Sequence, residues 1–360
     1  MGGPQVTSAN HRNFQCHCAD SSGGKRYGGR VETSATQKKS EFSPGVSVVL
    51  PILNEEPFLA DAVFAILAQK YNGELEVILA LGPSRDRTNE IAAQLARNDS
   101  RVVLVDNPTG RTAAGLNRAI AQGKYDIICR IDGHAEISDT YIADAVATML
   151  NTGAVNVGGI MAAVGKNRFE NAVATAMRSP LGVGGARFHI GWKAGPADTV
   201  YLGVFKRDAL QAAGGYDERF TRAQDWELNY RLRQAGGVIW FDPSLVVTYR
   251  PRPNLKALAK QYFEYGRWRH AVIRSHKGTA NYRYLAPPLT VAVSVLSIIL
   301  GLSISSIFYI PFGLYLLGNL LGSLAIGKSW SEKIILPAVL ATMHFSWGFG
   351  FLTSPKNLVK

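Results

Sequence analysis

The sequence predicts an α/β protein with a mostly parallel sheet, followed by carboxyl-terminal transmembrane helices. Two observations lead to this prediction. Between residues 46 and 241, short β-branched apolar runs alternate with helix-like segments, the pattern of a parallel sheet covered by helices on both faces. Residues 285–327 contain no Asp, Glu, Lys or Arg, and this run is long enough for two spanning helices.

Four strands and three helices are expected in the first part of the sheet. The β-branched run at 46–51 is the first strand, and a polar turn at 54–56 leads through Pro57 into a helix that ends near Gln69. Further strands are expected at 75–81, 101–105 and 126–132, with helices after the loop at 82–88 and at 111–122. Ligands bind at the carboxyl ends of such strands. Six polar residues fall there: Asn54, Glu55, Ser84, Asp86, Asp132 and His134.

Composition divides the chain into five parts. Residues 1–43 are rich in Gly, Ser and basic residues, so we expect a disordered tail, or a start codon assigned too early. The α/β domain is expected at 44–250 and a basic, aromatic segment at 251–284. The membrane region covers 285–353, with helices near 286–306, 308–327 and 334–353, and residues 354–360 form a tail. A buried helical subdomain is the alternative, although three such segments are hard to bury in so small a domain.

Basic residues near the apolar segments predict the orientation. Five precede the first segment and two lie between the second and third: Arg267, Arg269, Arg274, Lys277, Arg283, Lys328 and Lys333. The positive-inside rule then places the α/β domain in the cytoplasm, with a multi-pass anchor in the inner (plasma) membrane. Lys356 and Lys360, after the third segment, do not fit this rule. The third segment is therefore either a membrane span or an interfacial helix. The net charge of +12 is assigned to contact with anionic membrane lipid, and no nucleic acid partner is expected because no such motif occurs.

Two short motifs carry the expected chemistry. Asp132-Gly133-His134 ends a buried strand and could hold Mn²⁺ or Mg²⁺, since a cation shared with a diphosphate needs only one or two protein ligands. A helix cap or turn residue is the alternative for Asp132. Gln224-Asp225 opens a helix, where Asp225 is either a cap or a general base.

In this order, four motifs resemble the family 2 inverting glycosyltransferases with the GT-A fold, over residues 44–268. The similarity is greatest to the bacterial exopolysaccharide branch of the succinoglycan type. The motifs are VSVVLPILNEE from residue 46, RIDGHAE from 130, GGYDE from 214 and QDWELN from 224. The resemblance implies a Rossmann-like GT-A catalytic domain, a nucleotide-sugar donor such as a UDP-hexose, and a polyprenyl-linked sugar or glycan acceptor. It also implies a place in an envelope-glycan assembly complex.

The resemblance further implies roles for single residues. Asp225 would be the catalytic base, and Asp132 and His134 would be the metal ligands. The nucleotide-sugar would be bound by Pro51, Asn54, Glu55, Ser84, Asp86, Arg111 and Asp132. The acceptor or the diphosphate would contact Gln224, Arg267 and Trp268.

Three departures from the family pattern qualify this interpretation. Leu81 stands where an acidic residue usually contacts the nucleotide's base. The identity of the nucleotide is therefore not predicted. His134 replaces the last Asp of the metal motif, which favours Mn²⁺ over Mg²⁺. Glu264 stands where processive members have Gln, which weakens the case for a processive polysaccharide synthase. A non-catalytic membrane scaffold is the other alternative, which Leu81 favours and the presence of Asp132, His134 and Asp225 disfavours.

Overall fold

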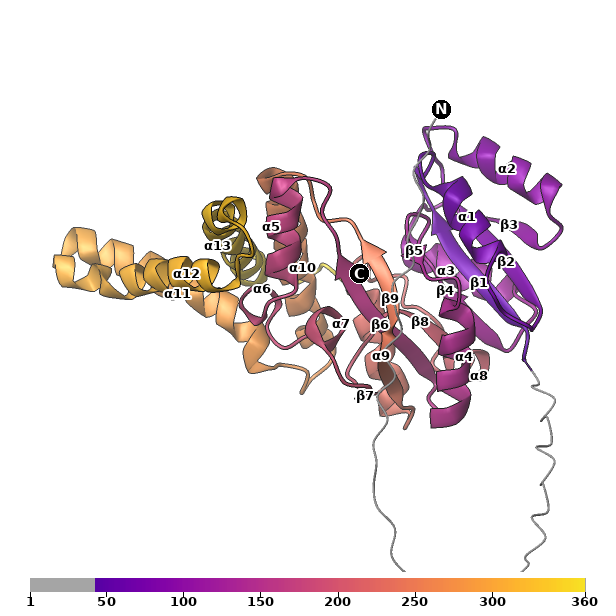
Figure 1. The fold of residues 1–360 in the computed structure, drawn as a ribbon. Helices are drawn as coiled ribbons and strands as arrows, with labels where there is room; N and C mark the ends of the chain where they lie inside the picture. The colour runs from indigo at the N-terminus through magenta and orange to yellow at the C-terminus, as the bar shows by residue number, and fades with distance from the viewer. Residues whose placement is uncertain (1–42, 360) are drawn as a thin grey trace, which may run out of the picture. The chain divides into compact units, whose positions relative to one another are not determined.

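The computed structural model describes residues 43–359, so the tail expected at 1–43 lies outside the described residues except for Ser43 (Figure 1). Within the described range nine strands form one sheet, in the order β3-β2-β1-β4-β8-β6-β9-β5, with β7 paired to β9. The strands are β1 (Val46–Ile52), β2 (Leu75–Leu81), β3 (Val102–Asp106), β4 (Ile127–Arg130), β5 (Glu136–Ile137), β6 (Asn156–Ala163), β7 (Gly195–Pro196), β8 (Tyr201–Lys206) and β9 (Ile239–Tyr249).

Helices connect and cover these strands. Those of the α/β part are α1 (Leu59–Leu67), α2 (Thr88–Asn98), α3 (Thr112–Gln122), α4 (Tyr141–Thr152), α5 (Arg168–Met177), α6 (Pro180–Val183), α7 (Arg187–Ile190), α8 (Arg207–Ala212) and α9 (Gln224–Gln234). The carboxyl-terminal ones are α10 (Leu255–Ser275), α11 (Tyr282–Ser303), α12 (Ile310–Ile326) and α13 (Trp330–Leu352), with a short 3₁₀ turn at Ser306–Tyr309.

The first four strands run parallel, as predicted. β1 pairs in parallel with both β2 and β4, and β2 with β3. Beyond β4 the sheet becomes mixed, because β8 is antiparallel to both β4 and β6. The fourth strand is shorter than the predicted 126–132: it ends at Arg130, so Asp132 lies in the loop beyond the sheet.

Alternate residues of the buried strands pack on opposite faces of the sheet, which fixes their register. Val48 of β1 belongs to a core cluster with Leu59 of α1 and Tyr141 of α4. Val49, its neighbour, belongs to a second cluster with Leu116 of α3 and residues of α9. Since a one-residue slip would exchange these faces, the carboxyl ends of β1, β2 and β4 are held at one edge of the sheet.

Three helices are long and apolar enough to cross a membrane, as predicted: Tyr282–Ser303, Ser306–Ile326 and Trp330–Leu352. Figure 1 shows α11 and α12 side by side, extending away from the sheet. α13 differs from them, because 39% of its apolar window is buried inside the structure, compared with 6% for the segment that contains α12. It packs against α5 of the α/β part and against α10.

Two glycines allow α10 and α13 to cross closely. A Cβ atom added to Gly266 would lie 1.9 Å from the carbonyl oxygen of Trp347, and one added to Gly350 would lie 2.1 Å from that of Phe263. A residue larger than glycine therefore cannot occupy either position at this backbone separation. His270 Nδ1 lies 2.7 Å from the backbone oxygen of Phe351 beside this crossing. α13 is thus a tightly docked helix that joins the α/β part to the α11–α12 hairpin.

Candidate active site

Hydrogen bonds fasten together the loops that follow β1 and β2. The N–H of Asn54 donates to Ser84 Oγ at 3.1 Å, and the Asn54 side-chain oxygen accepts from the N–H of Arg85 at 2.8 Å. The N–H of Glu55 donates to Thr88 Oγ1 at 2.7 Å. Asn54 has φ of 55°, the left-handed region that asparagine tolerates better than most residues. The two loops therefore form one fixed edge at the ends of β1 and β2.

Asp86 completes this edge as an acceptor of backbone hydrogen bonds. Its carboxylate accepts from the N–H groups of Glu56 at 3.2 Å and Thr88 at 3.1 Å, and also from the Thr88 hydroxyl. The hydroxyl hydrogen bond, with those of the backbone, holds the pKa of Asp86 below its ordinary value. Asp86 is therefore ionised at neutral pH, and its hydrogen bonds hold the loop after β2 against the loop after β1.

Arg130, the last residue of β4, joins two carboxylates for which the sequence predicts functions. Its side chain is 5% exposed, and its Nε and Nη2 donate to Asp132 Oδ1 at 3.2 and 3.1 Å. Its Nη1 donates to Asp225 Oδ1, in the first turn of α9. One guanidinium thus brings the predicted metal ligand and the predicted base together. The sequence analysis did not single out Arg130, although a charged residue within an apolar strand was a usable signal.

The surroundings of Asp225 make its carboxylate more basic. Removal from water raises the pKa of Asp225, while the positive charge of Arg130 lowers it and offsets part of the effect. A carboxylate with a raised pKa accepts a proton more readily than an ordinary aspartate. Asp225 is therefore suited to act as a base.

The backbone at the start of α9 is held in a costly conformation. Ala223, the residue before the helix, has φ of 60°, which costs a non-glycine residue about 1–2 kcal/mol. The helix is anchored one turn later by Glu227, which is 1% exposed and accepts from Arg231 with both oxygens at 2.7 Å. His276 Nε2 lies 3.1 Å from the same carboxylate. These contacts fix the first turn of α9 and with it the position of Asp225.

His134 is oriented by a carboxylate. Its Nδ1 lies 2.8 Å from Glu55 Oε1, and this hydrogen bond raises the pKa of His134 although desolvation opposes it. Metal-binding histidines commonly make such a bond through one ring nitrogen and bind the metal through the other. The contact therefore leaves Nε2 for a ligand and gives Glu55 a positioning contact in addition to its predicted place at the nucleotide.

These residues fit a divalent cation that shares its coordination with a diphosphate. Asp132 uses Oδ1 for Arg130 and retains Oδ2, and His134 retains Nε2. No cluster of three or more His, Cys, Asp and Glu able to hold a metal occurs in residues 43–359, so this part of the chain offers no complete protein cage. Two protein ligands suffice when substrate phosphates supply the others.

The remaining residues expected at the nucleotide lie around the same edge. Pro51 is in β1 and partly exposed, and Arg111 is exposed directly before α3. Gln224, expected at the acceptor or the diphosphate, is buried at the start of α9. Leu81 ends β2 and is paired in register with Asp106 of β3. A carboxylate therefore does lie beside Leu81, on the neighbouring strand.

Arg267 and Trp268, expected at the acceptor, lie in different surroundings. Trp268 is 4% exposed, and its ring centroid is 5.9 Å from that of Phe220. Both belong to a small core cluster with Trp226 of α9. Arg267 pairs with Glu264 on the same helix at 2.9 Å. Trp268 therefore supports the loop and first turn that carry Asp225 by packing against them.

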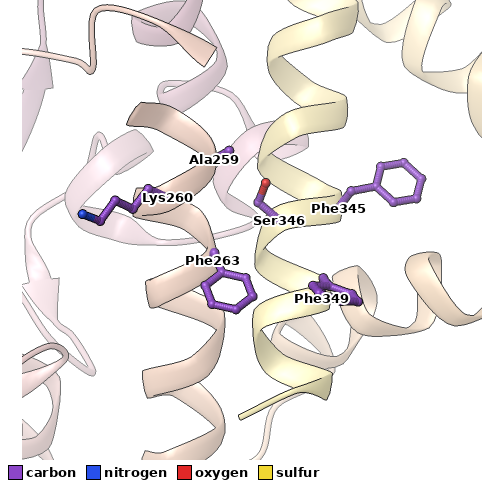
Figure 2. A pocket seen from close by; sticks show the side chains of 6 residues that line it. All are labelled: Ala259, Lys260, Phe263, Phe345, Ser346 and Phe349. Atoms are coloured by element: carbon purple, nitrogen blue, oxygen red, sulfur yellow. The ribbon is translucent and has the colours of Figure 1, made fainter. Parts of the chain in front are cut away.

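A groove of about 480 Å³ lies between α10 and α13, and it does not resemble a nucleotide site (Figure 2). It is lined by Ala259, Lys260, Phe263, Phe345, Ser346 and Phe349. Figure 2 shows the Lys260 ammonium extending away from α13. A diphosphate needs several converging polar groups, and this lining offers one charge among three phenylalanines. The groove is therefore not a candidate for the nucleotide, whose expected residues lie at the edge of the sheet.

Comparison with known proteins identifies the family. A family model described as glycosyl transferase family 2 matches residues 47–214, which include Asp132 and His134. The succinoglycan biosynthesis protein ExoA of Rhizobium meliloti (strain 1021) is 33% identical over 308 residues, which cover 84% of this chain and 93% of the relative. This chain belongs to glycosyltransferase family 2. It is therefore a glycosyltransferase, and the scaffold alternative is set aside.

Two further similarities extend over most of this family 2 enzyme. A dolichyl N-acetyl-alpha-D-glucosaminyl phosphate 3-beta-D-2,3-diacetamido-2,3-dideoxy-beta-D-glucuronosyltransferase of Methanococcus voltae is 24% identical over 326 residues, or 88% of this chain and 97% of the relative. The solved mannosyltransferase PcManGT of Pyrobaculum calidifontis, in complex with GDP-Man and Mn²⁺, has a TM-score of 0.59 at 20% identity and covers 84% of this chain and 86% of its own. The structural likeness confirms the predicted GT-A fold.

Proposed function

We propose that this family 2 enzyme transfers a hexose from a nucleotide-sugar, with UDP-hexose as the first candidate, to a lipid-linked sugar in exopolysaccharide or envelope-glycan synthesis. The observation that carries the proposal is the contact of Arg130 with both Asp132 and Asp225. It joins a metal-binding carboxylate and a base at the edge where GT-A enzymes bind their donors. Relatives named for succinoglycan biosynthesis and for transfer to a dolichyl-linked sugar support the choice of acceptor.

The proposed reaction is a single displacement with inversion. Asp225 accepts the proton of an acceptor hydroxyl while that oxygen bonds to the anomeric carbon, and the nucleoside diphosphate leaves from the opposite face. The raised pKa of Asp225 supports its role as base. A divalent cation, Mn²⁺ or Mg²⁺, bound by Asp132 and His134 would neutralise charge on the departing diphosphate. Arg130 holds the two carboxylates beside each other throughout.

The apolar helices support a place at the inner membrane, with the catalytic part in the cytoplasm. Helices α11 and α12 expose broad apolar surfaces along their length, which suits contact with lipid. α13 is docked on α5 and α10, so we propose that it anchors the catalytic part at the membrane surface. Three helices are few to enclose a polysaccharide, which favours transfer of one sugar over processive synthesis and secretion.

Replacing the base tests the proposed function. Asp225→Asn should lower kcat by about 10²–10⁴-fold, the usual contribution of a general base, while the nucleotide-sugar still binds. Asp208→Asn is the control, because Asp208 is likewise an acid in the first turn of a helix but is exposed and lies on α8. Transfer would be followed with radiolabelled donor and membrane acceptor. Turnover of Asp225→Asn at the control rate would contradict the assignment.

A further inference from the structure

Two arginines on α10 and α11 carry more positive charge than their surroundings balance. Arg269 forms no ion pair within residues 43–359, and its Nη1 is buried without a hydrogen-bond partner there. Arg283 Nε is buried without a partner in the same range. Its carboxylate contact in this range is Asp198 at 3.9 Å, and the Asp198 side chain is 62% exposed. A buried N–H donor without an acceptor destabilises the folded protein. An acceptor from a bound ligand would remove this destabilisation at both positions.

Aromatic rings hold both guanidinium groups in place. The Arg269 guanidinium lies 4.7 Å from the ring centroid of Trp226 and 4.3 Å from that of Tyr284. The Arg283 guanidinium lies 5.7 Å from the same tyrosine ring. Such stacking fixes the planes of the two groups but provides no hydrogen-bond acceptor for Arg269 Nη1 or Arg283 Nε. The pair is therefore preorganised for an anion with several oxygens.

The two charges also oppose each other. Burial lowers the pKa of Arg269, and the positive charge of Arg283 lowers it further. An anion between the two groups would relieve this repulsion and supply the missing acceptors. Phosphate groups suit this role because their oxygens match the fork of a guanidinium.

The cluster lies between the apolar helices and the predicted base. Arg283 is the second residue of α11, the first helix able to span a membrane, and Tyr282 before it is 81% exposed. Arginine and tyrosine are typical of the level of lipid headgroups. On the other side, Trp226 directly follows Asp225 in the first turn of α9. A group held here is at once near the headgroup level and next to the catalytic turn.

We propose that Arg269 and Arg283 bind the diphosphate of the lipid-linked acceptor, a compound of the polyprenyl diphosphate class. This inference rests on the proposed function, because it requires a lipid-linked acceptor. It assigns the acceptor's charged group to a place distinct from the donor edge at Asp132. It also gives a role to the stacking of the Arg269 guanidinium on two rings from separate helices, Tyr284 and Trp226.

Binding of undecaprenyl diphosphate to the full chain in detergent tests the proposal, without any donor present. Arg269→Gln and Arg283→Gln should each weaken binding by about tenfold or more, as expected when a charge-assisted hydrogen bond is lost. Lys277→Gln is the matched control: it removes the same charge from an exposed residue just beyond α10. Arg269→Lys should recover part of the affinity, since it keeps the charge but not the planar fork.

Two further readouts separate binding from folding and from the proposed function. UDP affinity and melting temperature should stay at the control values in both arginine variants; a parallel loss of all three would show a structural clamp between α10 and α11 and overturn the proposal. Equal competition by phosphatidylglycerol would show a general anionic-lipid site and also overturn it. A wild-type enzyme that hydrolyses a nucleotide-sugar but does not bind undecaprenyl diphosphate would refute this site alone. Failure to use any donor would instead refute the proposed function.

Discussion

Arg130→Gln should separate the two carboxylates that the site depends on. The Arg130 side chain is 5% exposed, and those of Asp132 and Asp225 are 21% and 28% exposed. Removing one partner of a buried ion pair costs about 3–5 kcal/mol, and the partial exposure of the carboxylates favours the lower end. A loss of about 3 kcal/mol corresponds to a melting temperature lower by about 6–12 °C for a cooperative unit the size of the α/β domain, roughly 200 residues.

The same variant should change the pH dependence of the reaction. Asp225 acts as a base when it is ionised, so activity is lost as the pH falls through its pKa. Arg130 lowers this pKa by its charge, and its removal raises the pKa further. The acid limb of kcat/KM should therefore move to higher pH in Arg130→Gln and stay near the wild-type position in Arg130→Lys.

The assay is the pH profile of kcat/KM for donor, together with the melting temperature of each variant. A profile of Arg130→Gln with the wild-type acid limb, in protein that melts at the wild-type temperature, would refute the reasoning. It would mean that Arg130 neither holds Asp225 nor sets its proton affinity.

Two other predictions follow from separate contacts. Asp132→Ala should abolish the increase in UDP affinity that Mn²⁺ produces, because one of two protein ligands is lost; titration calorimetry with and without Mn²⁺ measures this, and an unchanged Mn²⁺ effect would contradict the metal role. Gly266→Ala should destabilise the α10–α13 crossing by about 1–3 kcal/mol, since the added Cβ meets backbone at 1.9 Å. Gly313→Ala on α12 is its control, because a Cβ there meets nothing within 4 Å; equal melting temperatures for the two variants would contradict the close crossing.

Local patterns in the sequence were enough to predict the first four strands and the apolar helices. Continuous β-branched runs predict buried parallel strands wherever they occur, and β1 to β3 lie within one residue of their expected bounds. The fourth strand ends early, at Arg130, and the backbone then turns at Asp132, whose carbonyl oxygen accepts from the N–H of Ala135 at 2.9 Å. The hydrophobic pattern alone does not predict where a strand ends in such a turn.

The contacts within the site depend on residues far apart in the sequence, which a single sequence cannot pair. Asp132 and Asp225 were recognised by their motifs, but the contact of Arg130 with both of them emerges only from the fold, which brings the end of β4 to the start of α9. For Trp268 the motif predicts a contact with the acceptor or the diphosphate. In the structure its side chain is buried against Phe220. The docking of α13 likewise depends on glycines whose role appears only when two helices cross.

The most direct test of the central claim is donor binding by the purified full chain, with a panel of UDP-, GDP- and dTDP-sugars in the presence and absence of Mn²⁺. The proposed function predicts that one donor binds preferentially, that Mn²⁺ strengthens its binding, and that this effect of Mn²⁺ is lost in Asp132→Ala. Binding of no donor in either condition, by protein with a normal melting transition, would contradict a working nucleotide-sugar site at Arg130, Asp132 and Asp225.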